Sequence, residues 1–244
     1  MNEIKQAVIL AGGQGLRLRP LTNDRPKPMI LIHGKPLLEY MVEVLKENGI
    51  EEIVMLVGYM PEKIMEYFGD GSRFGLSIKY SIGRVEDDTG TRIRNAKEFL
   101  APDFLLMYAD NYWPFLDLEK MGEFFHSSKK LGLMVVYDNK DGRGEEGYKC
   151  NVMVGDNDRV LYYDRIHTND PKIKWTEVGF FVFNRKILDF MPKDREVSLS
   201  RDILPDLVKK EELMAWKTNE VQYGITSSED IPIFEDKLKS LRSQ

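Results

Sequence analysis

A glycine-rich segment near the amino terminus, closely followed by two cations, has the residue types needed to hold a polyphosphate. An apolar run ending at Leu10 and Ala11 leads directly into Gly12-Gly13-Gln14-Gly15. Because glycine has no Cβ, the backbone N–H groups of such a turn can approach phosphate oxygens closely. Arg17 and Lys27 follow at short intervals and supply positive charge where the phosphates would lie. These residues predict binding of a nucleoside triphosphate.

A glycine cluster at the end of a strand is also common in plain tight turns, so the alternative reading is purely structural. Two familiar phosphate motifs do not fit the segment. The third glycine of a dinucleotide-binding turn is absent, and no Gly-Lys-Ser/Thr follows at P-loop spacing. The ordered continuation through Thr22 and Pro26-Lys27-Pro28 favours phosphate binding over a simple turn.

The run from Leu10 to Thr22, with Pro26-Lys27-Pro28 after it, resembles the signature of the sugar-1-phosphate nucleotidyltransferases, L-A-G-G-x-G-T-R-L-x-P-L-T followed by x-P-K-P. The resemblance implies the nucleotide-diphospho-sugar transferase fold. It also implies that a sugar 1-phosphate attacks the α-phosphorus of a nucleoside triphosphate and that pyrophosphate leaves. Arg17 would then neutralise the pyrophosphate, Lys27 would bridge the two reacting phosphates, and residues 10–15 would contact the nucleotide. Leu16 departs from the pattern, since the family has threonine there.

A second apolar run ends in an acidic residue, at Tyr108-Ala109-Asp110-Asn111. In open α/β sheets, ligands bind beyond the carboxyl ends of the strands, where this carboxylate is expected to lie. The resemblance implies that Asp110 coordinates Mg²⁺, the expected cofactor. It also implies that Tyr108 and Asp110 contact the nucleotide and that Asn111 contacts the sugar phosphate. The alternative is that Asp110-Asn111 only forms an Asx turn.

The segment Asp88-Thr89-Gly90-Thr91 resembles the equivalent loop of cytidylyltransferases that act on glucose 1-phosphate. The resemblance implies that Thr89 and Gly90 contact the nucleotide, with threonine hydroxyls on the base edge and the glycine backbone nearby. Threonine is also well suited to capping the helix expected to begin near Arg92. Arg92 and Arg94 are expected to be solvated helix charges without a role.

The sugar-phosphate side is expected in the carboxyl-terminal half of the chain. Arg165, in Tyr162-Tyr163-Asp164-Arg165, stands where the family usually has a lysine that grips the sugar phosphate. Further downstream, the resemblance implies that Glu177 accepts hydrogen bonds from sugar hydroxyls and that Gly179 leaves room for the ring. Asn151 is a weaker candidate for a hydroxyl contact. The alternative for Glu177 and Gly179 is a strand-edge charge and a bulge glycine.

One position departs from the metal-binding pattern of the family. A second acidic ligand usually lies near the carboxyl terminus, in a context such as Asp-Ile-Gly-Thr-Pro-Glu, and alignment places Gly224 at that acid. The missing carboxylate argues against a metal site with two acidic ligands. Mg²⁺ can still be held by one carboxylate together with substrate phosphates and water.

Strand-like and helix-like segments alternate along the chain, which predicts an α/β fold with a Rossmann-like mixed, mostly parallel sheet flanked by helices. The expected strands are residues 6–10, 53–57, 76–81, 104–108, 132–137, 152–154, 160–163 and 178–183, with a turn at 156–158 joining the sixth and seventh. The expected helices are residues 36–48, 61–68, 92–100, 118–128, 199–209 and 231–241.

Length and composition place further bounds on the protein. The 244 residues fit a single domain, with a nucleotide-binding half of about 1–115 and a sugar-phosphate half of about 116–244. The net charge of −5 disfavours a nucleic-acid partner. No apolar run is long enough to cross a bilayer, so no membrane partner is expected. A single cysteine, Cys150, cannot form an intramolecular disulfide and favours a cytoplasmic setting.

The identity of the base and the acceptor stays open at this point. Asp88-Thr89-Gly90 favours CTP, whereas Tyr163-Asp164 and the single-domain length resemble heptose- and mannose-1-phosphate guanylyltransferases and favour GTP. Two other functions remain: a catalytically weak homologue that binds a nucleotide sugar and regulates a partner, and a cytidylyltransferase acting on a non-sugar phosphate. The family often assembles, so a homodimer is the oligomeric state to test for.

Overall fold

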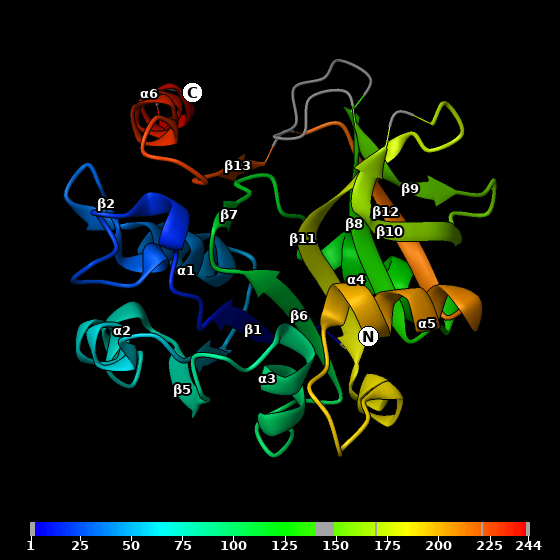
Figure 1. The fold of residues 1–244 in the computed structure, drawn as a ribbon, viewed down its shortest axis with the longest axis horizontal. Helices are drawn as coiled ribbons and strands as arrows, with labels where there is room; N and C mark the ends of the chain where they lie inside the picture. The colour runs from blue at the N-terminus through cyan, green and yellow to red at the C-terminus, as the bar shows by residue number, and fades with distance from the viewer. Residues whose placement is uncertain (1–2, 140–148, 169, 221, 243–244) are drawn as a thin grey trace.

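A mixed sheet of nine strands forms the centre of the protein, and helices lie on both of its faces (Figure 1). The computed structural model describes residues 3–139, 149–168, 170–220 and 222–242. The strands of this sheet are β1 (Gln6–Ala11), β4 (Glu52–Val57), β5 (Ser77–Ile82), β6 (Asp103–Tyr108), β8 (Gly132–Asp138), β9 (Cys150–Val154), β10 (Val160–Thr168), β11 (Trp175–Asn184) and β12 (Leu213–Thr218). The helices are α1 (Leu37–Glu47), α2 (Pro61–Phe68), α3 (Thr89–Asn95), α4 (Leu118–Ser128), α5 (Leu204–Lys209) and α6 (Asp230–Arg242).

The order of paired strands is β10-β9-β11-β6-β1-β4-β5, and β8 lies between β11 and β12. Strands β5, β4, β1 and β6 run parallel to one another, whereas β11 is antiparallel to β6. The register places Ala7 of β1 opposite Ile53 on one side and Leu105 on the other. The carboxyl ends of β1, β4 and β6 therefore meet at one edge of the sheet, where α/β folds bind ligands.

The central strands β1, β4 and β6 are buried on both faces because helices cover the sheet from both sides. In β1, Ala7 and Ile9 pack in one hydrophobic cluster with residues of α1, α4 and α6. Val8 and Leu10 point the other way and pack with residues of α3 and α5. A strand covered on both faces reads as a continuous apolar run, which is why the first strand is recognisable in the sequence.

Short two-residue strands complete the description. Strand β2 (Leu31–Ile32) pairs with β3 (Lys35–Pro36), and β7 (Asn111–Tyr112) pairs with β13 (Tyr223–Gly224). The second pair holds the segment before α6 directly against the residues that follow β6. Of the helices described, none combines the length and the apolar character needed to cross a membrane.

The predicted fold class is confirmed, and so is most of its element order. Asp117 caps α4, because its carboxylate accepts a hydrogen bond from the N–H of Lys120 at 3.2 Å. The predicted helix over residues 92–100 is wrong: α3 begins at Thr89, since the side chain of Asp88 caps it, and ends at Asn95. The segment expected as one helix over 199–209 opens with a π-helical turn before α5. Strand β12 was not predicted.

Candidate active site

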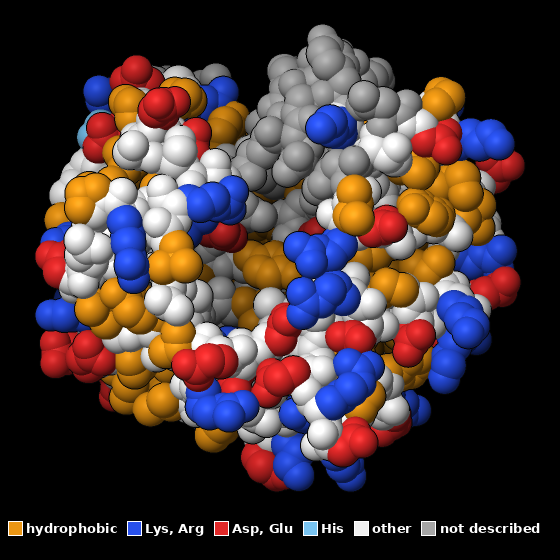
Figure 2. Space-filling view, in the orientation of Figure 1, with side chains coloured by type: hydrophobic (Ala, Val, Ile, Leu, Met, Phe, Trp, Pro, Cys, Tyr) orange, Lys and Arg blue, Asp and Glu red, His pale blue; other side chains and the backbone are white. Residues whose placement is uncertain are grey.

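A cavity of about 600 Å³ opens at the edge of the sheet where the parallel strands end, and most residues of the predicted nucleotide site line it. Its lining comprises residues 10–18, 27–28, 85–89, 92, 108–110 and 226. Figure 2 shows this face of the molecule hollowed near its centre, with basic and acidic side chains around the hollow. The lining thus includes every predicted nucleotide-contact residue except Gly90, together with Arg17 and Lys27.

The glycine-rich loop between β1 and Lys27 is held in one conformation by contacts on its outer side. Gly15 has a φ of +61°, a left-handed conformation that favours glycine, and its carbonyl accepts a hydrogen bond from the Thr22 hydroxyl at 2.9 Å. The hydroxyl of Tyr59 in turn donates to the Thr22 carbonyl at 3.1 Å. Leu18 is buried beneath the short 3₁₀ turn Leu16–Leu18. The loop is therefore a prearranged wall of the cavity.

Lys27 and Asp110 form an ion pair inside the cavity, with 2.8 Å between Lys27 Nζ and Asp110 Oδ2. The lysine lies at the start of a 3₁₀ turn, Lys27–Met29, and its side chain is only 12% exposed. The carboxylate follows β6 and is 38% exposed, so it still faces the cavity. Arg17 also lines the cavity and makes no ion pair with any described residue. Arg17, Lys27 and Asp110 therefore all line the same cavity as the glycine-rich loop.

The donor set around Asp110 fits a magnesium ion only if the substrate supplies most of the ligands. Among the residues described, no group of three or more His, Cys, Asp or Glu side chains is placed to hold a metal. Gly224 pairs with Asn111 across β13 and β7, so the position aligned with a second acid lies next to Asp110 but has no side chain. Mg²⁺ commonly binds one or two carboxylates and takes phosphates and water as its other ligands. One carboxylate facing a polyphosphate site is compatible with that requirement.

Four of the predicted sugar-phosphate residues form a hydrogen-bonded cluster beside the cavity, although none of them lines it. Asn151 accepts a hydrogen bond from the Glu177 N–H at 2.9 Å, and the Glu177 carboxylate accepts one from the Gly179 N–H. Asn111 Nδ2 donates to the Val178 carbonyl at 3.0 Å. A bulge in β11 between Glu177 and Phe181 produces this arrangement.

Gly179 is required at that bulge for two reasons. Its φ is +81°, and a Cβ at this position would lie 2.6 Å from Asn111 Nδ2 and 2.8 Å from Tyr108 Cδ2. The bulge therefore brings the β11 backbone close to the residues around Asp110. This geometry explains the glycine structurally, whether or not a sugar ring lies above it.

The Glu177 carboxyl lies in an environment that favours its neutral form. Burial raises the pKa of Glu177 to about 7, and the nearby charge of Asp110 acts in the same direction, although the Gly179 N–H opposes the shift. Burial also raises the pKa of the Tyr108 hydroxyl well above its usual range. Glu177 therefore changes charge near neutral pH.

Two predicted contact residues lie elsewhere. Arg165 is exposed on β10, and within the described residues it makes no hydrogen bond or ion pair with the Asn151–Glu177 cluster. Gly90 faces Val197, because a Cβ there would lie 2.8 Å from Val197 Cγ1. The hydroxyls of Thr89 and Thr91 accept hydrogen bonds from the N–H groups of Leu199 and Val197, both at 2.9 Å. These contacts join α3 to the segment before α5.

Arg92 is the main residue that sequence reasoning missed. The expectation of a solvated charge is wrong, since the side chain is buried, with 6% exposure, and it lines the cavity. The prediction failed because the partners of the guanidinium are backbone carbonyls of other segments, which no local pattern indicates. Other unpredicted lining residues include Val85, Glu86 and Thr226, whose environment no sequence signal indicated.

The sequence of this chain is similar to a known protein family and to several curated proteins. The sequence model of the nucleotidyl transferase family matches residues 6–222. A mannose-1-phosphate guanylyltransferase of Mycobacterium tuberculosis is 33% identical over 202 residues, which cover 83% of this chain and 55% of that protein. A probable glucose-1-phosphate cytidylyltransferase of Bacillus subtilis is 28% identical over 250 residues, covering 92% and 91%. The chain thus spans about half the length of several curated relatives it matches.

The fold of this chain is also similar to solved structures. HddC from Yersinia pseudotuberculosis superimposes with a TM-score of 0.78 at 25% identity, and the match covers 96% of this chain and all of that one. A second structure of HddC, complexed with GMP-PN, matches equally well. The similarity extends over the whole sheet and its helices.

Proposed function

The chain belongs to the nucleotidyl transferase family, and from this membership and the geometry of the cavity we propose that it joins a nucleoside triphosphate to a sugar 1-phosphate. An oxygen of the sugar phosphate attacks the α-phosphorus, the bond from that phosphorus to the bridging oxygen breaks, and pyrophosphate leaves. The product is a nucleoside-diphosphate sugar. The observation that carries the proposal is the convergence of Arg17, Lys27 and Asp110 on one glycine-rich cavity.

Catalysis in this reaction rests on alignment and charge, because the attacking phosphate is already an anion and needs no general base. The loop N–H groups and Arg17 bind the β- and γ-phosphates, and the guanidinium neutralises charge on the departing pyrophosphate. Lys27 holds the attacking phosphate and the α-phosphate together. Its ammonium lies 2.8 Å from Asp110 Oδ2, so contact with the phosphates would compete with that ion pair.

Asp110 is the residue that would hold Mg²⁺. When bound there with substrate phosphates and water, the ion would supply positive charge that offsets the charge on the phosphate oxygens. Arg17, Lys27 and Asp110 then act on the same polyphosphate. The sugar side of the site is proposed at Asn111, Asn151 and Glu177, which lie beside Asp110.

The base is proposed to be guanine or cytosine. The support comes from relatives named as a guanylyltransferase and a cytidylyltransferase, and from a structural neighbour solved with GMP-PN. A cytoplasmic location and a homodimer also stay predictions, supported by the single cysteine and by the resemblance to an assembling family.

A panel that combines binding and turnover tests the proposal. Thermal shift with each triphosphate and Mg²⁺ identifies the preferred nucleotide, since a ligand that binds the native state raises the melting temperature. Pyrophosphate release is then measured with that nucleotide and a set of sugar 1-phosphates. Release that depends on both substrates supports the proposal. Strong nucleotide binding without release under any acceptor contradicts it and points to a regulatory homologue.

A further inference from the structure

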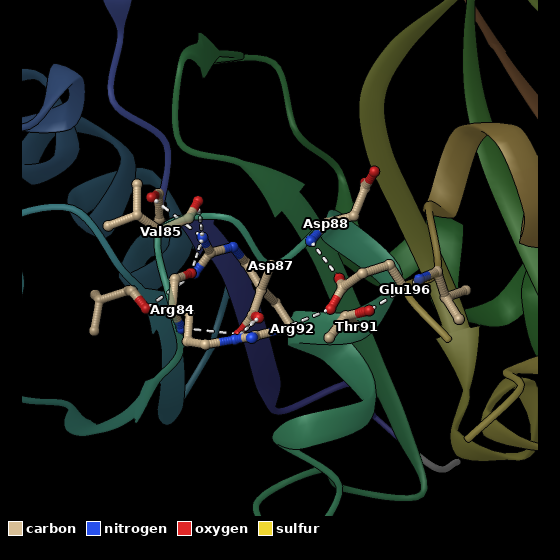
Figure 3. A network of polar contacts seen from close by, with 10 residues as sticks. Arg84, Val85, Asp87, Asp88, Thr91, Arg92 and Glu196 are labelled. Carbon is tan, nitrogen blue, oxygen red and sulfur yellow. Dashed lines mark hydrogen bonds and ion pairs between the residues drawn. The ribbon is translucent and has the colours of Figure 1, made fainter. Parts of the chain in front are cut away.

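The guanidinium of Arg92 is buried at the wall of the cavity, and within the part of the chain that the structure describes its hydrogen bonds go to backbone carbonyls. Arg92 Nη1 donates to the Val57 carbonyl at 3.1 Å. Arg92 Nη2 lies within hydrogen-bond distance of three more carbonyls, those of Arg84 at 2.7 Å, Val85 at 3.2 Å and Gly12 at 3.4 Å. Figure 3 shows the side chain reaching from α3 to the backbone of Arg84 and Val85. One side chain thus ties together the segments that follow β1, β4 and β5.

No carboxylate among the described residues forms an ion pair with this guanidinium. Burial lowers the pKa of Arg92, while the charge of nearby Asp87 raises it, and an arginine stays protonated in either case. Asp87 is itself bound by Arg84, whose N–H and Nε donate to it at 2.8 and 2.9 Å. Burying this charge is costly unless it is hydrogen-bonded, and the four carbonyl contacts together with the nearby charge of Asp87 offset that cost.

Three glycines leave the space that the guanidinium occupies. A Cβ on Gly12 would lie 2.3 Å from Arg92 Cζ and one on Gly58 would lie 2.5 Å from Nη1, whereas one on Gly83 would lie 2.8 Å from Asp87 Oδ2 and 3.3 Å from Arg92 Nη1. These glycines directly follow β1, β4 and β5. None of the three has a positive φ, so glycine is needed at each for space rather than for its conformation. The guanidinium therefore has a site of its own at the edge of the sheet.

Arg92 is one of two groups that hold the carbonyl of the peptide leading into the glycine-rich loop. The Gly12 carbonyl points toward Arg92 and also accepts a hydrogen bond from the Tyr59 N–H at 3.1 Å. In a planar trans peptide the C=O and N–H point in opposite directions. The N–H of Gly13 is therefore directed away from Arg92, and Gly13 is exposed and lines the cavity.

We propose that Arg92 is a positioning residue that orients the Gly12–Gly13 peptide and the Arg84–Val85 backbone for binding of the triphosphate. The inference rests on the proposed function, because it assumes that a nucleoside triphosphate occupies the cavity. Arg92 fixes two separate segments of the cavity wall at once. Such preorganisation lowers the cost of ordering the loop when the nucleotide binds.

The test compares Arg92→Lys with Arg94→Lys. Lysine keeps the positive charge but replaces the planar fork of five N–H donors by a compact ammonium with three, which does not reproduce the spread of the guanidinium over its carbonyl acceptors. Arg94 is the matched control: it lies on the same helix and also donates to backbone carbonyls, those of Pro192 and Arg195, but it does not line the cavity. The readout is the dissociation constant of a non-hydrolysable analogue of the preferred triphosphate, by calorimetry without an acceptor.

We expect Arg92→Lys to weaken binding of the analogue about tenfold or more, the effect of losing one charged hydrogen bond. The KM for the sugar 1-phosphate at saturating nucleotide should stay at its wild-type value. Arg94→Lys should bind the analogue as the wild type does, even if it melts at a lower temperature. Unchanged binding in Arg92→Lys, or equal weakening in both variants, overturns the inference.

Gly12→Ala keeps the inference testable if Arg92→Lys does not fold. The nearest atoms to its new Cβ all belong to the Arg92 guanidinium, so the substitution displaces that group and leaves the charge in place. Weaker binding of the analogue supports the inference, and wild-type binding contradicts it. If the wild-type protein itself binds no triphosphate, the proposed function fails before any variant is compared, and this inference fails with it.

Discussion

Replacing Lys27 by methionine is expected to strengthen metal binding in the free protein while it abolishes turnover. In the structure, Lys27 Nζ lies 2.8 Å from Asp110 Oδ2, so a cation that binds Asp110 must compete with the ammonium. Methionine keeps the unbranched, apolar body of lysine and removes only the charge. The variant therefore separates two consequences of one contact: loss of a competitor for the metal and loss of a phosphate-binding group.

The expected gain in metal affinity follows from the distance between Lys27 and Asp110 and from how exposed their side chains are. Two unit charges 2.8 Å apart attract by about 1.5 kcal/mol in water and by about 6 kcal/mol at an effective dielectric constant of 20. Asp110 is 38% exposed, so solvent screening places the net value near the lower end. Removing about 1.5 kcal/mol of competition corresponds to about tenfold tighter metal binding. Turnover should fall by about 10² or more, as for loss of other groups that stabilise charge in a transition state.

Asp110 alone binds a cation weakly, so the first effect is measured by titrating Mn²⁺ or Mg²⁺ to millimolar concentrations into nucleotide-free protein, and pyrophosphate release measures the second. Lys35→Met is the matched control, because Lys35 forms a comparable partly buried pair with Glu43 at 2.6 Å and does not line the cavity. Lys35→Met should change neither the metal affinity nor the rate of pyrophosphate release. If Lys27→Met binds the metal no more tightly than the wild type, Asp110 is not the metal ligand and the reasoning is refuted.

Two further predictions concern the acceptor side. The folded-state pKa of Glu177, about 7, exceeds the unfolded value of 4.5, so the free energy of unfolding should fall as pH rises between these values and then level off. Glu177→Gln should remove that fall, which amounts to about 3 kcal/mol at most, and chemical denaturation across this pH range would show it. Gly179→Ala should cost about 1–3 kcal/mol from backbone strain plus a steric clash with Asn111 and Tyr108. Gly34→Ala is the control, because Gly34 has a φ of +79° and open space around it, so an alanine there adds only backbone strain. Equal losses in the free energy of unfolding of the two variants would contradict the predicted clash at Gly179.

The parts of the site that the sequence predicted are those carried by a local pattern. The glycine-rich loop and Asp110 each follow a continuous apolar strand, and parallel strands bring their carboxyl ends to one edge. Their convergence on one cavity therefore follows from sheet topology. The ion pair between Lys27 and Asp110 joins residues 83 positions apart, and no local pattern indicates it.

The parts that were missed depend on tertiary contacts. Arg92 reads as a solvated helix charge because its partners are backbone carbonyls of three distant segments. The sequence does show that a glycine directly follows each of three parallel strands, at Gly12, Gly58 and Gly83, and these glycines leave space around the guanidinium. Strand β12 alternates weakly between buried and partly buried residues and follows two glutamates, so its pairing with β8 was hidden. Arg165 was assigned by position in a motif, and its exposed place on β10 does not bring it into the cluster around Glu177.

The most direct test of the central proposal follows the α-phosphate of the preferred triphosphate. The protein is incubated with a sugar 1-phosphate and with triphosphate labelled at the α or the γ position, and the products are separated. We predict that the α label appears in the nucleoside-diphosphate sugar and the γ label in pyrophosphate, with both signals lost in Lys27→Met. Release of the γ label as inorganic phosphate, or no transfer of the α label despite tight nucleotide binding, would contradict nucleotidyl transfer.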